Sequence, residues 1–353
     1  KWLSLFLILF LGVGYTARAA DEGWEIVEHC FGEATEPPEG WTFDGTMLLT
    51  STGRLHAYRQ EWETPRILVF SNGLPSWSAL SPDMRWYAVV EFEREESFVF
   101  TTFHEKAIRV YSLIDDTQYL IPWENSWSAS HRVYGHRLYW LDNEHLLYSQ
   151  GDLFQEWYRI NPFSQEIEQW NSDLDPSEFV YDLAPDADKA LFTDWGLDYW
   201  VLDRGEDEIQ LPIVNIAGWS PDSSQFAAYT GVNYRAQQFV LFDADGSLTE
   251  TLLEIPQDTQ NYWLYSNLWS PSGDDLLFTT DRLYLADIEN RHIVDLCLSS
   301  EGMRSAVWSP DGNQFALTTY DRDDGIQIFD LETWQRYVVS YHNGSIIGWR
   351  SDD

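Results

Sequence analysis

The chain has 353 residues, 44% of them hydrophobic and 16% aromatic, which is enough for one large domain with a substantial core. Its 21 lysine and arginine residues stand against 58 acidic residues, so the formal net charge is −37. Because Lys and Arg supply most of the affinity for nucleic acids and anionic lipid headgroups, this balance argues against both kinds of partner.

Residues 1–20 are typical of a bacterial export signal, with a positive Lys1, an apolar run and Ala17-Arg18-Ala19 as a cleavage motif. The apolar run is about a dozen residues, shorter than the roughly 20 that span a bilayer, although an uncleaved signal anchor is the alternative. We expect a periplasmic or secreted protein with no membrane insertion after signal removal. An N-terminal extension, 21–40, and one domain, 41–353, follow.

The sequence holds two cysteines, Cys30 in the extension and Cys297 late in the domain. In an oxidising compartment they are candidates for one disulfide between distant parts of the chain. The alternative is two unpaired thiols, with Cys297 an ordinary apolar residue of a strand.

A repeat with a period of about 40 to 50 residues runs through the domain, and each copy places a tight turn after an apolar strand. Proline fixes φ in these turns and glycine supplies a positive φ. In chain order the copies are Phe43-Asp44-Gly45, Leu80-Ser81-Pro82-Asp83, Trp140-Leu141-Asp142, Leu183-Ala184-Pro185-Asp186, Trp219-Ser220-Pro221-Asp222, Trp269-Ser270-Pro271, Trp308-Ser309-Pro310-Asp311-Gly312 and a truncated Gly348-Trp349-Arg350.

Three further strands follow each turn; in the last complete copy they are expected at 314–318, 326–330 and 336–340. Four antiparallel strands per unit are the signature of a propeller blade. The C-terminal segment 346–349 supplies only a first strand, whereas 47–70 supplies only the later three. We therefore expect an all-β propeller of seven four-stranded blades, closed by pairing the two ends of the chain in one blade.

Tryptophans recur at one position of the repeat, and we expect them to pack between blades. The residues assigned to the repeat itself are Pro82, Asp83, Pro185, Asp186, Trp219, Pro221, Asp222, Trp269, Pro271, Trp308, Pro310, Asp311, Gly312 and Trp349.

The Trp-Ser-Pro-Asp-Gly copies, followed by a Phe-Ala strand, resemble the repeats of TolB-like propellers, also described as WD40-like or PD40 repeats. The resemblance extends over residues 41–353. The Gly-His and Trp-Asp pairs of true WD40 repeats are missing. TolB itself is similar only in the propeller, so the resemblance implies a fold and leaves a TolB-specific role open.

No motif in the sequence predicts a catalytic, cofactor-binding or metal-binding residue: Gly-x-Ser-x-Gly and His-Glu-x-x-His are both absent. Residues 243–247 and 321–325 resemble pieces of calcium loops, but neither has the downstream Glu of an EF-hand, and turn formation alone explains 243–247. Calcium therefore stays a minor alternative to no cofactor. Channel-facing carboxylates also stay open, because 58 acidic residues ensure that some approach one another.

The step from Pro82 to Asp142 is stretched to 60 residues, and insertions in propellers emerge as loops that often bind partners. Trp157 and Tyr158 follow the insertion at the start of a predicted strand, and for at least one of them packing between blades is favoured over the patch. The candidate binding patch comprises Trp123, Trp127, His131, Tyr134, His136, Trp157 and Tyr158.

These observations favour a monomeric, non-catalytic propeller that binds a protein, peptide or glycan at the cell envelope. The alternative is a hydrolase or lyase that uses channel-facing carboxylates, with or without a bound cation. The preference rests on analogy at the level of the fold.

Overall fold

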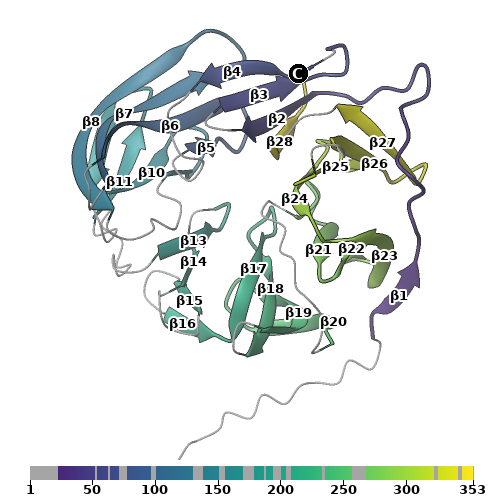
Figure 1. The fold of residues 1–353 in the computed structure, drawn as a ribbon. Helices are drawn as coiled ribbons and strands as arrows, with labels where there is room; N and C mark the ends of the chain where they lie inside the picture. The colour runs from purple at the N-terminus through teal and green to yellow at the C-terminus, as the bar shows by residue number, and fades with distance from the viewer. Residues whose placement is uncertain are drawn as a thin grey trace, which may run out of the picture.

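The computed structural model describes residues 23–51, 54–62, 64–70, 78–96, 101–129, 138–150, 156–169, 179–186, 188–193, 200–203, 208–232, 235–256, 268–321, 325–340 and 344–352. All regular structure in these ranges is β-strand. The strands form seven four-stranded sheets around a central opening (Figure 1). The protein is therefore a seven-bladed β-propeller, as the repeat predicts.

Each blade is numbered here from the one that contains both ends of the domain. Blade 1 contains β28 (Ser345–Arg350), β2 (Thr46–Ser51), β3 (Arg54–Tyr58) and β4 (Arg66–Phe70). Blade 2 contains β5 (Ser78–Leu80), β6 (Trp86–Glu96), β7 (Thr101–Ser112) and β8 (Gln118–Ala129). Blade 3 contains β9 (Leu138–Trp140), β10 (Leu146–Gln150), β11 (Glu156–Asn161) and β12 (Glu166–Gln169).

The remaining blades follow in chain order. Blade 4 contains β13 (Phe179–Leu183), β14 (Ala190–Thr193), β15 (Trp200–Asp203) and β16 (Glu208–Leu211). Blade 5 contains β17 (Ile213–Trp219), β18 (Gln225–Val232), β19 (Arg235–Asp243) and β20 (Leu248–Glu254). Blade 6 contains β21 (Asp275–Thr279), β22 (Arg282–Asp287), β23 (His292–Ser299) and β1 (Glu25–Glu28). Blade 7 contains β24 (Met303–Trp308), β25 (Gln314–Thr319), β26 (Ile326–Asp330) and β27 (Gln335–Ser340).

Blade 1 closes the ring in the predicted way. The C-terminal strand β28 pairs antiparallel with β2, with Met47 opposite Trp349, and β2 continues to β3 and β4. One blade is thus built from residues some 300 positions apart, and no sheet edge is left open where the ring meets itself.

Blade 6 departs from the predicted pattern. Within the described residues, which begin here at Leu268, its innermost position is one bridge between Trp269 and Leu276, and the outermost strand of its sheet is β1 from the N-terminal extension. β1 runs parallel to β23, whereas the strands within the repeat are antiparallel. The extension is therefore part of the propeller and not a separate leader to it.

We call residues 24–45 the N-terminal strap, because they lie along the outer edges of blades 6 and 7 before entering blade 1 (Figure 1). Beyond β1, Thr35 forms a parallel bridge with Tyr337 of β27, and its N–H donates to Arg336 O at 3.1 Å. Cys30 of the strap and Cys297 of β23 form a disulfide.

The stretched step between Pro82 and Asp142 takes a different form from the expected loop. Strands β6, β7 and β8 have 11, 12 and 12 residues and pair with one another over most of their length. Much of the additional sequence therefore lengthens three strands of blade 2. The expectation that this insertion emerges as a loop was wrong for much of its length, because the backbone ladder between β7 and β8 continues to Ala129.

The repeated tryptophans pack between blades, as predicted, and their indoles also form a hydrogen-bonded series. Trp269 Nε1 donates to Gly218 O of the preceding blade at 3.0 Å, and Trp308 Nε1 donates to Leu268 O at 2.9 Å. Trp140 Nε1 donates in the same way to Ala79 O at 3.2 Å. In these three tryptophans the buried donor thus finds an acceptor on the innermost segment of the preceding blade, which links the two blades.

Candidate binding site at the channel mouth

The repeated Ser-Pro-Asp turns are held by their own side chains. In blade 7, Ser309 Oγ donates to Asp311 Oδ1 at 2.6 Å and accepts the N–H of Gln314 at 2.9 Å. The equivalent bond from Ser220, followed by that from Ser224, keeps the pKa of Asp222 below its usual value. The carboxylates of Asp222 and Asp311 therefore stabilise their own turns as anions, and their hydrogen-bonding oxygens are already used within the turn.

The same turns build a hollow where the innermost strands of five blades converge. We call this hollow, about 370 Å³ in volume, the mouth hollow. The lining also includes Trp269, Trp308 and Trp349, three residues that are themselves buried. Prolines from four repeats complete much of the lining: Pro82, Pro221, Pro271 and Pro310. A residue type needed for turn geometry therefore also provides a rigid apolar wall.

Arg350, the last residue of β28, is the only basic residue in this lining. Its Nη2 donates to Leu113 O at 2.9 Å, and its buried Nε has no hydrogen-bond partner among the described residues. Burial and the nearby Arg59 and Arg85 hold the pKa of Arg350 below its ordinary value, and Asp352 opposes them. Arg59 and Arg85 therefore lie near enough to Arg350 to affect it, although neither is among the residues that line the hollow.

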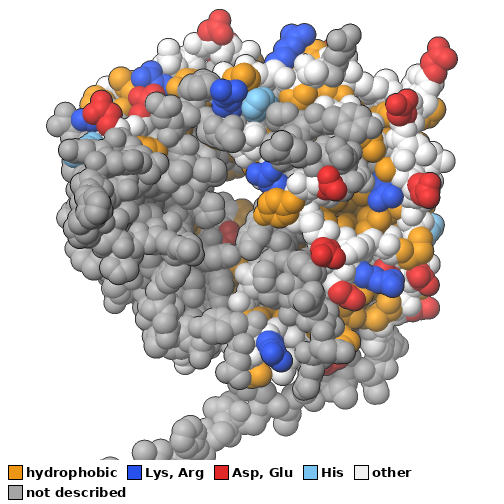
Figure 2. Space-filling model, in the orientation of Figure 1, with side chains coloured by type: hydrophobic (Ala, Val, Ile, Leu, Met, Phe, Trp, Pro, Cys, Tyr) orange, Lys and Arg blue, Asp and Glu red, His pale blue; other side chains and the backbone are white. Residues whose placement is uncertain are grey.

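The two carboxylates closest to these arginines are already engaged. Asp352 pairs with Arg59 at 3.0 Å, and Asp83 Oδ1 accepts bonds from Ser81 Oγ at 2.6 Å and from the N–H of Arg85 at 3.1 Å. Figure 2 shows the central opening with a Lys or Arg side chain and a hydrophobic side chain at its rim. A guanidinium beside proline rings is suited to hold a ligand that has both an acidic group and an apolar face.

A second unusual group, Asp182, lies on β13, the innermost strand of blade 4. Burial raises the pKa of Asp182 to about 7, although the backbone N–H groups of Leu183 and Trp219 donate to it. Asp182 occupies the repeat position of Gly218, and at this boundary Trp219 Nε1 is buried without a partner among the described residues. Among the described residues the interblade indole bond is therefore missing at this boundary, and the backbone N–H of Trp219 donates to the Asp182 carboxyl group instead.

We expect Asp182→Asn to flatten the dependence of stability on pH. Because the pKa is raised from 3.8 to about 7, the folded protein keeps a proton that the unfolded chain releases, and stability falls as pH rises through this window. The variant should be more stable than wild type above pH 7, by about 1–3 kcal/mol, and nearly equal to it near pH 4. Urea denaturation from pH 4 to 8 measures this difference, with the exposed Asp116→Asn as a control.

The structure does not assemble the aromatic patch predicted from the stretched repeat. Trp123 and Trp157 are buried, and Trp123 packs edge-to-face on Tyr148 and Tyr158, joining blades 2 and 3. The assignment of Trp123 to a binding patch was wrong, because the strands of blade 2 continue and turn it into the core. The burial of Trp157 agrees with the blade packing expected for at least one of Trp157 and Tyr158. Trp127 lies in β8 with its side chain outside the described residues, as are His131, Tyr134 and His136 altogether.

The segment 243–247, which resembles a calcium loop, forms the turn between β19 and β20. The N–H of Ser247 donates to Asp245 Oδ1 at 2.8 Å, and Gly246 has a φ of 83°. Its Asp and Gly residues are accounted for by the turn. The second such segment, 321–325, lies partly outside the described residues.

The sequence contained a signal for both Arg350 and Asp182 that the motif search missed. Arg350 stands where other copies have the turn-closing serine, as in Trp219-Ser220 and Trp308-Ser309, and Asp182 stands in the column of Gly218. When one copy of a repeat has a different residue at a position that normally serves the turn, that residue is not there for the turn and is a candidate for another role.

No protein-family model matches this sequence, and no curated protein matches it. By contrast, 925 chains of solved structures are similar, so the fold is widespread and says little about activity. One is titled "Oligogalacturonate lyase in complex with manganese", with a TM-score of 0.49 and 13% identity over 89% of this chain and 87% of that chain. Among the described residues, none forms a helix of the length and hydropathy needed to cross a membrane.

Proposed function

We propose that the protein is an extracytoplasmic binding module that receives an acidic group of a protein, peptide or glycan in the mouth hollow. The observation that supports this proposal is Arg350, the one basic residue among the described residues that line a hollow walled largely by prolines. A carboxylate in the hollow would accept a charge-assisted hydrogen bond from a guanidinium N–H that Leu113 O leaves free.

The electrostatic setting supports selectivity for one acidic group at the mouth over polyanions. The overall charge of −37 repels a uniformly charged polymer. At physiological salt, charges more than about 8 Å away are largely screened, so a ligand group in the hollow responds mainly to the nearby charge of Arg350. A ligand with a single carboxylate next to an apolar or sugar face fits this pattern.

The test is a panel of glycans and peptides, each offered with free carboxylates and with the same groups amidated. We expect saturable binding of acidic members and a loss of about tenfold or more in affinity in Arg350→Ala, as for a charge-assisted hydrogen bond. Arg235→Ala, at the β18–β19 hairpin on the opposite end of the strands, is the matched control and should bind normally. Equal binding of amidated ligands would refute the proposal.

A second candidate function, a propeller hydrolase or lyase, is favoured by Asp182. A carboxyl group with a pKa of about 7 on an innermost strand can donate or accept a proton at neutral pH. This candidate predicts turnover of a bound ligand with a pH–rate profile that bends near 7 and is abolished in Asp182→Asn. A ligand that binds and is released unchanged supports the binding module instead.

A further inference from the structure

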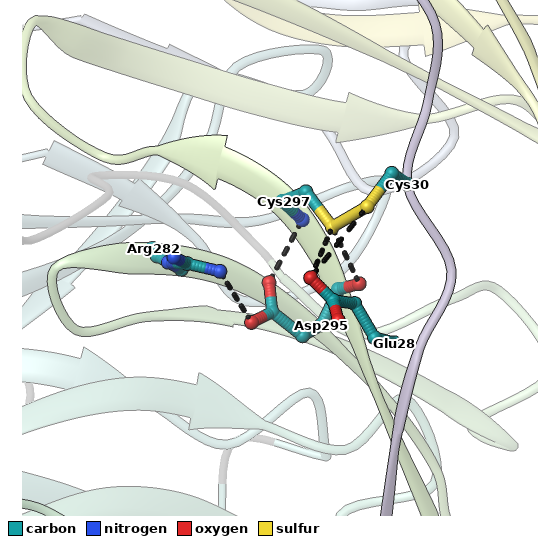
Figure 3. Close-up of a disulfide and its surroundings, with 5 residues drawn as sticks. All are labelled: Glu28, Cys30, Arg282, Asp295 and Cys297. Atoms are coloured by element: carbon teal, nitrogen blue, oxygen red, sulfur yellow. Dashed lines mark hydrogen bonds and ion pairs between the residues drawn. A yellow bond between two sulfur atoms is a disulfide. The ribbon is translucent and has the colours of Figure 1, made fainter.

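The strap brings three potential metal ligands together where it is fastened to blade 6 (Figure 3). Glu28 is the last residue of β1, Cys30 follows it, and Cys297 lies in β23 with a φ of 58°. Among the residues that the structure describes, these are the one group of His, Cys, Asp or Glu side chains whose ligand atoms lie within 4.8 Å of one another.

The position of the Glu28 carboxylate is not explained by the disulfide. Its Oε1 lies 3.4 Å from Cys297 Sγ and 3.9 Å from Cys30 Sγ, and Figure 3 shows it facing both sulfur atoms. Disulfide sulfurs carry no proton, so in the oxidised form this carboxylate gains no hydrogen bond from them. Two thiolates holding a cation would give the carboxylate a strong partner.

The distances fit a zinc ion. Zinc bonds of about 2.3 Å to sulfur and 2.0–2.2 Å to oxygen in tetrahedral geometry place sulfur and oxygen ligands about 3.6 Å apart. The observed separations of 3.4 and 3.9 Å bracket that value. After reduction only the two sulfur atoms need to move apart, because the Glu28 carboxylate already lies at the required distance.

The surroundings hold these ligands in place without the disulfide. Asp295 Oδ1 accepts the N–H of Cys297 at 2.8 Å, and Arg282 fixes Asp295 Oδ2 at 2.9 Å. On the strap side, the N–H of His29 donates to Asp295 O at 3.0 Å next to the parallel β1–β23 ladder. Outer hydrogen bonds of this kind orient metal ligands and tune their affinity.

We propose that reduction of the Cys30–Cys297 disulfide creates a zinc-binding site formed by the two thiolates and Glu28, with a water molecule in the fourth position. A dithiol or phosphine supplies two electrons, and two protons are taken up as the S–S bond breaks to give two thiols. Zinc then displaces both protons. The disulfide and the zinc ion are thus alternative cross-links between the strap and blade 6. This inference is independent of the function of the mouth hollow.

The test uses the mature chain, reduced with a phosphine under anaerobic conditions and titrated with Co²⁺ as a spectroscopic probe. We expect a thiolate-to-cobalt charge-transfer absorption at one equivalent, lost on adding Zn²⁺ and absent from the oxidised protein. Glu28→Gln should weaken zinc binding by about tenfold or more while still forming the disulfide, which shows that the variant folds. Glu33→Gln, an exposed change on the same strap, should behave as wild type.

Cys30→Ser should lose the absorption. The proposal is overturned if the reduced wild type shows no charge-transfer band, or if Glu28→Gln and Glu33→Gln bind zinc equally well. Loss of binding in both glutamate variants would also overturn it, since that would assign the effect to the general acidity of the strap.

Discussion

Replacing Trp349 with alanine is expected to lower the free energy of unfolding by about 3–5 kcal/mol. The side chain is 1% exposed and packs edge-to-face on Phe43 at 5.6 Å between ring centroids. Its Nε1 donates to Asp44 O at 2.8 Å, and it shares a core cluster with Val307 of blade 7. The variant therefore leaves a cavity and an unpaired carbonyl at the point where the ring closes.

Urea denaturation followed by tryptophan fluorescence and by far-UV circular dichroism measures this loss. Tyr320→Ala is the control, because this side chain is 63% exposed and its contact is the Arg304 guanidinium at 5.5 Å. We expect the control to change stability by less than about 0.5 kcal/mol. A small effect for Trp349→Ala would mean that blade 1 is not the closure of the propeller.

The second large effect is expected from Cys30→Ser. The disulfide joins residues 267 apart, and in the chain-entropy model the loss of so long a constraint costs about 2–5 kcal/mol. Part of the cost falls on the strap, because all four residues of its strand β1 are exposed, although Phe31 still anchors the strap in the core beside Phe329. We therefore expect both a lower unfolding midpoint and faster proteolysis of the strap.

Thermal unfolding with and without a reductant, in the presence of a metal chelator, measures this contribution. Reductant should lower the midpoint of the wild type to that of Cys30→Ser and should leave the variant unchanged. If reductant has no effect on the wild type, the disulfide does not contribute to stability.

The fold was predictable because the repeat encodes it locally. Proline and serine in the turns, as in Ser309-Pro310, set where a strand ends. The partial repeats at 47–70 and 346–349 each lack strands that the other supplies, so together they predict one complete blade. The parallel strand β1 was not predictable, because Glu25–Glu28 has no alternating pattern and pairs only through the edge of β23. A strand added at a sheet edge leaves no periodic signal in its own sequence.

The site was harder to predict than the fold. Aromatic residues near an insertion suggested a patch, yet Trp123 is buried since β8 continues along β7. Arg350 and Asp182 matter through their neighbours, such as the Leu113 carbonyl and the Trp219 N–H, which come from other blades. Sequence spacing cannot report which side chains of different blades meet at a channel.

Ring closure and ligand binding are linked through one strand in this structure. β28 completes blade 1 with Trp349 and presents Arg350 to the mouth hollow. The position of the candidate ligand site thus depends on the closure of the propeller.

The central claim is that an acidic ligand binds in the mouth hollow, and site-specific photocrosslinking tests it most directly. A photoreactive residue is placed at Ile347, which lines the hollow, or at Val232, which is 55% exposed at the end of β18 remote from it. With the best acidic ligand of the panel, we predict crosslinks from Ile347 that the unlabelled ligand displaces, and none from Val232. Crosslinks from Val232, or none from Ile347 at saturating ligand, would contradict the account.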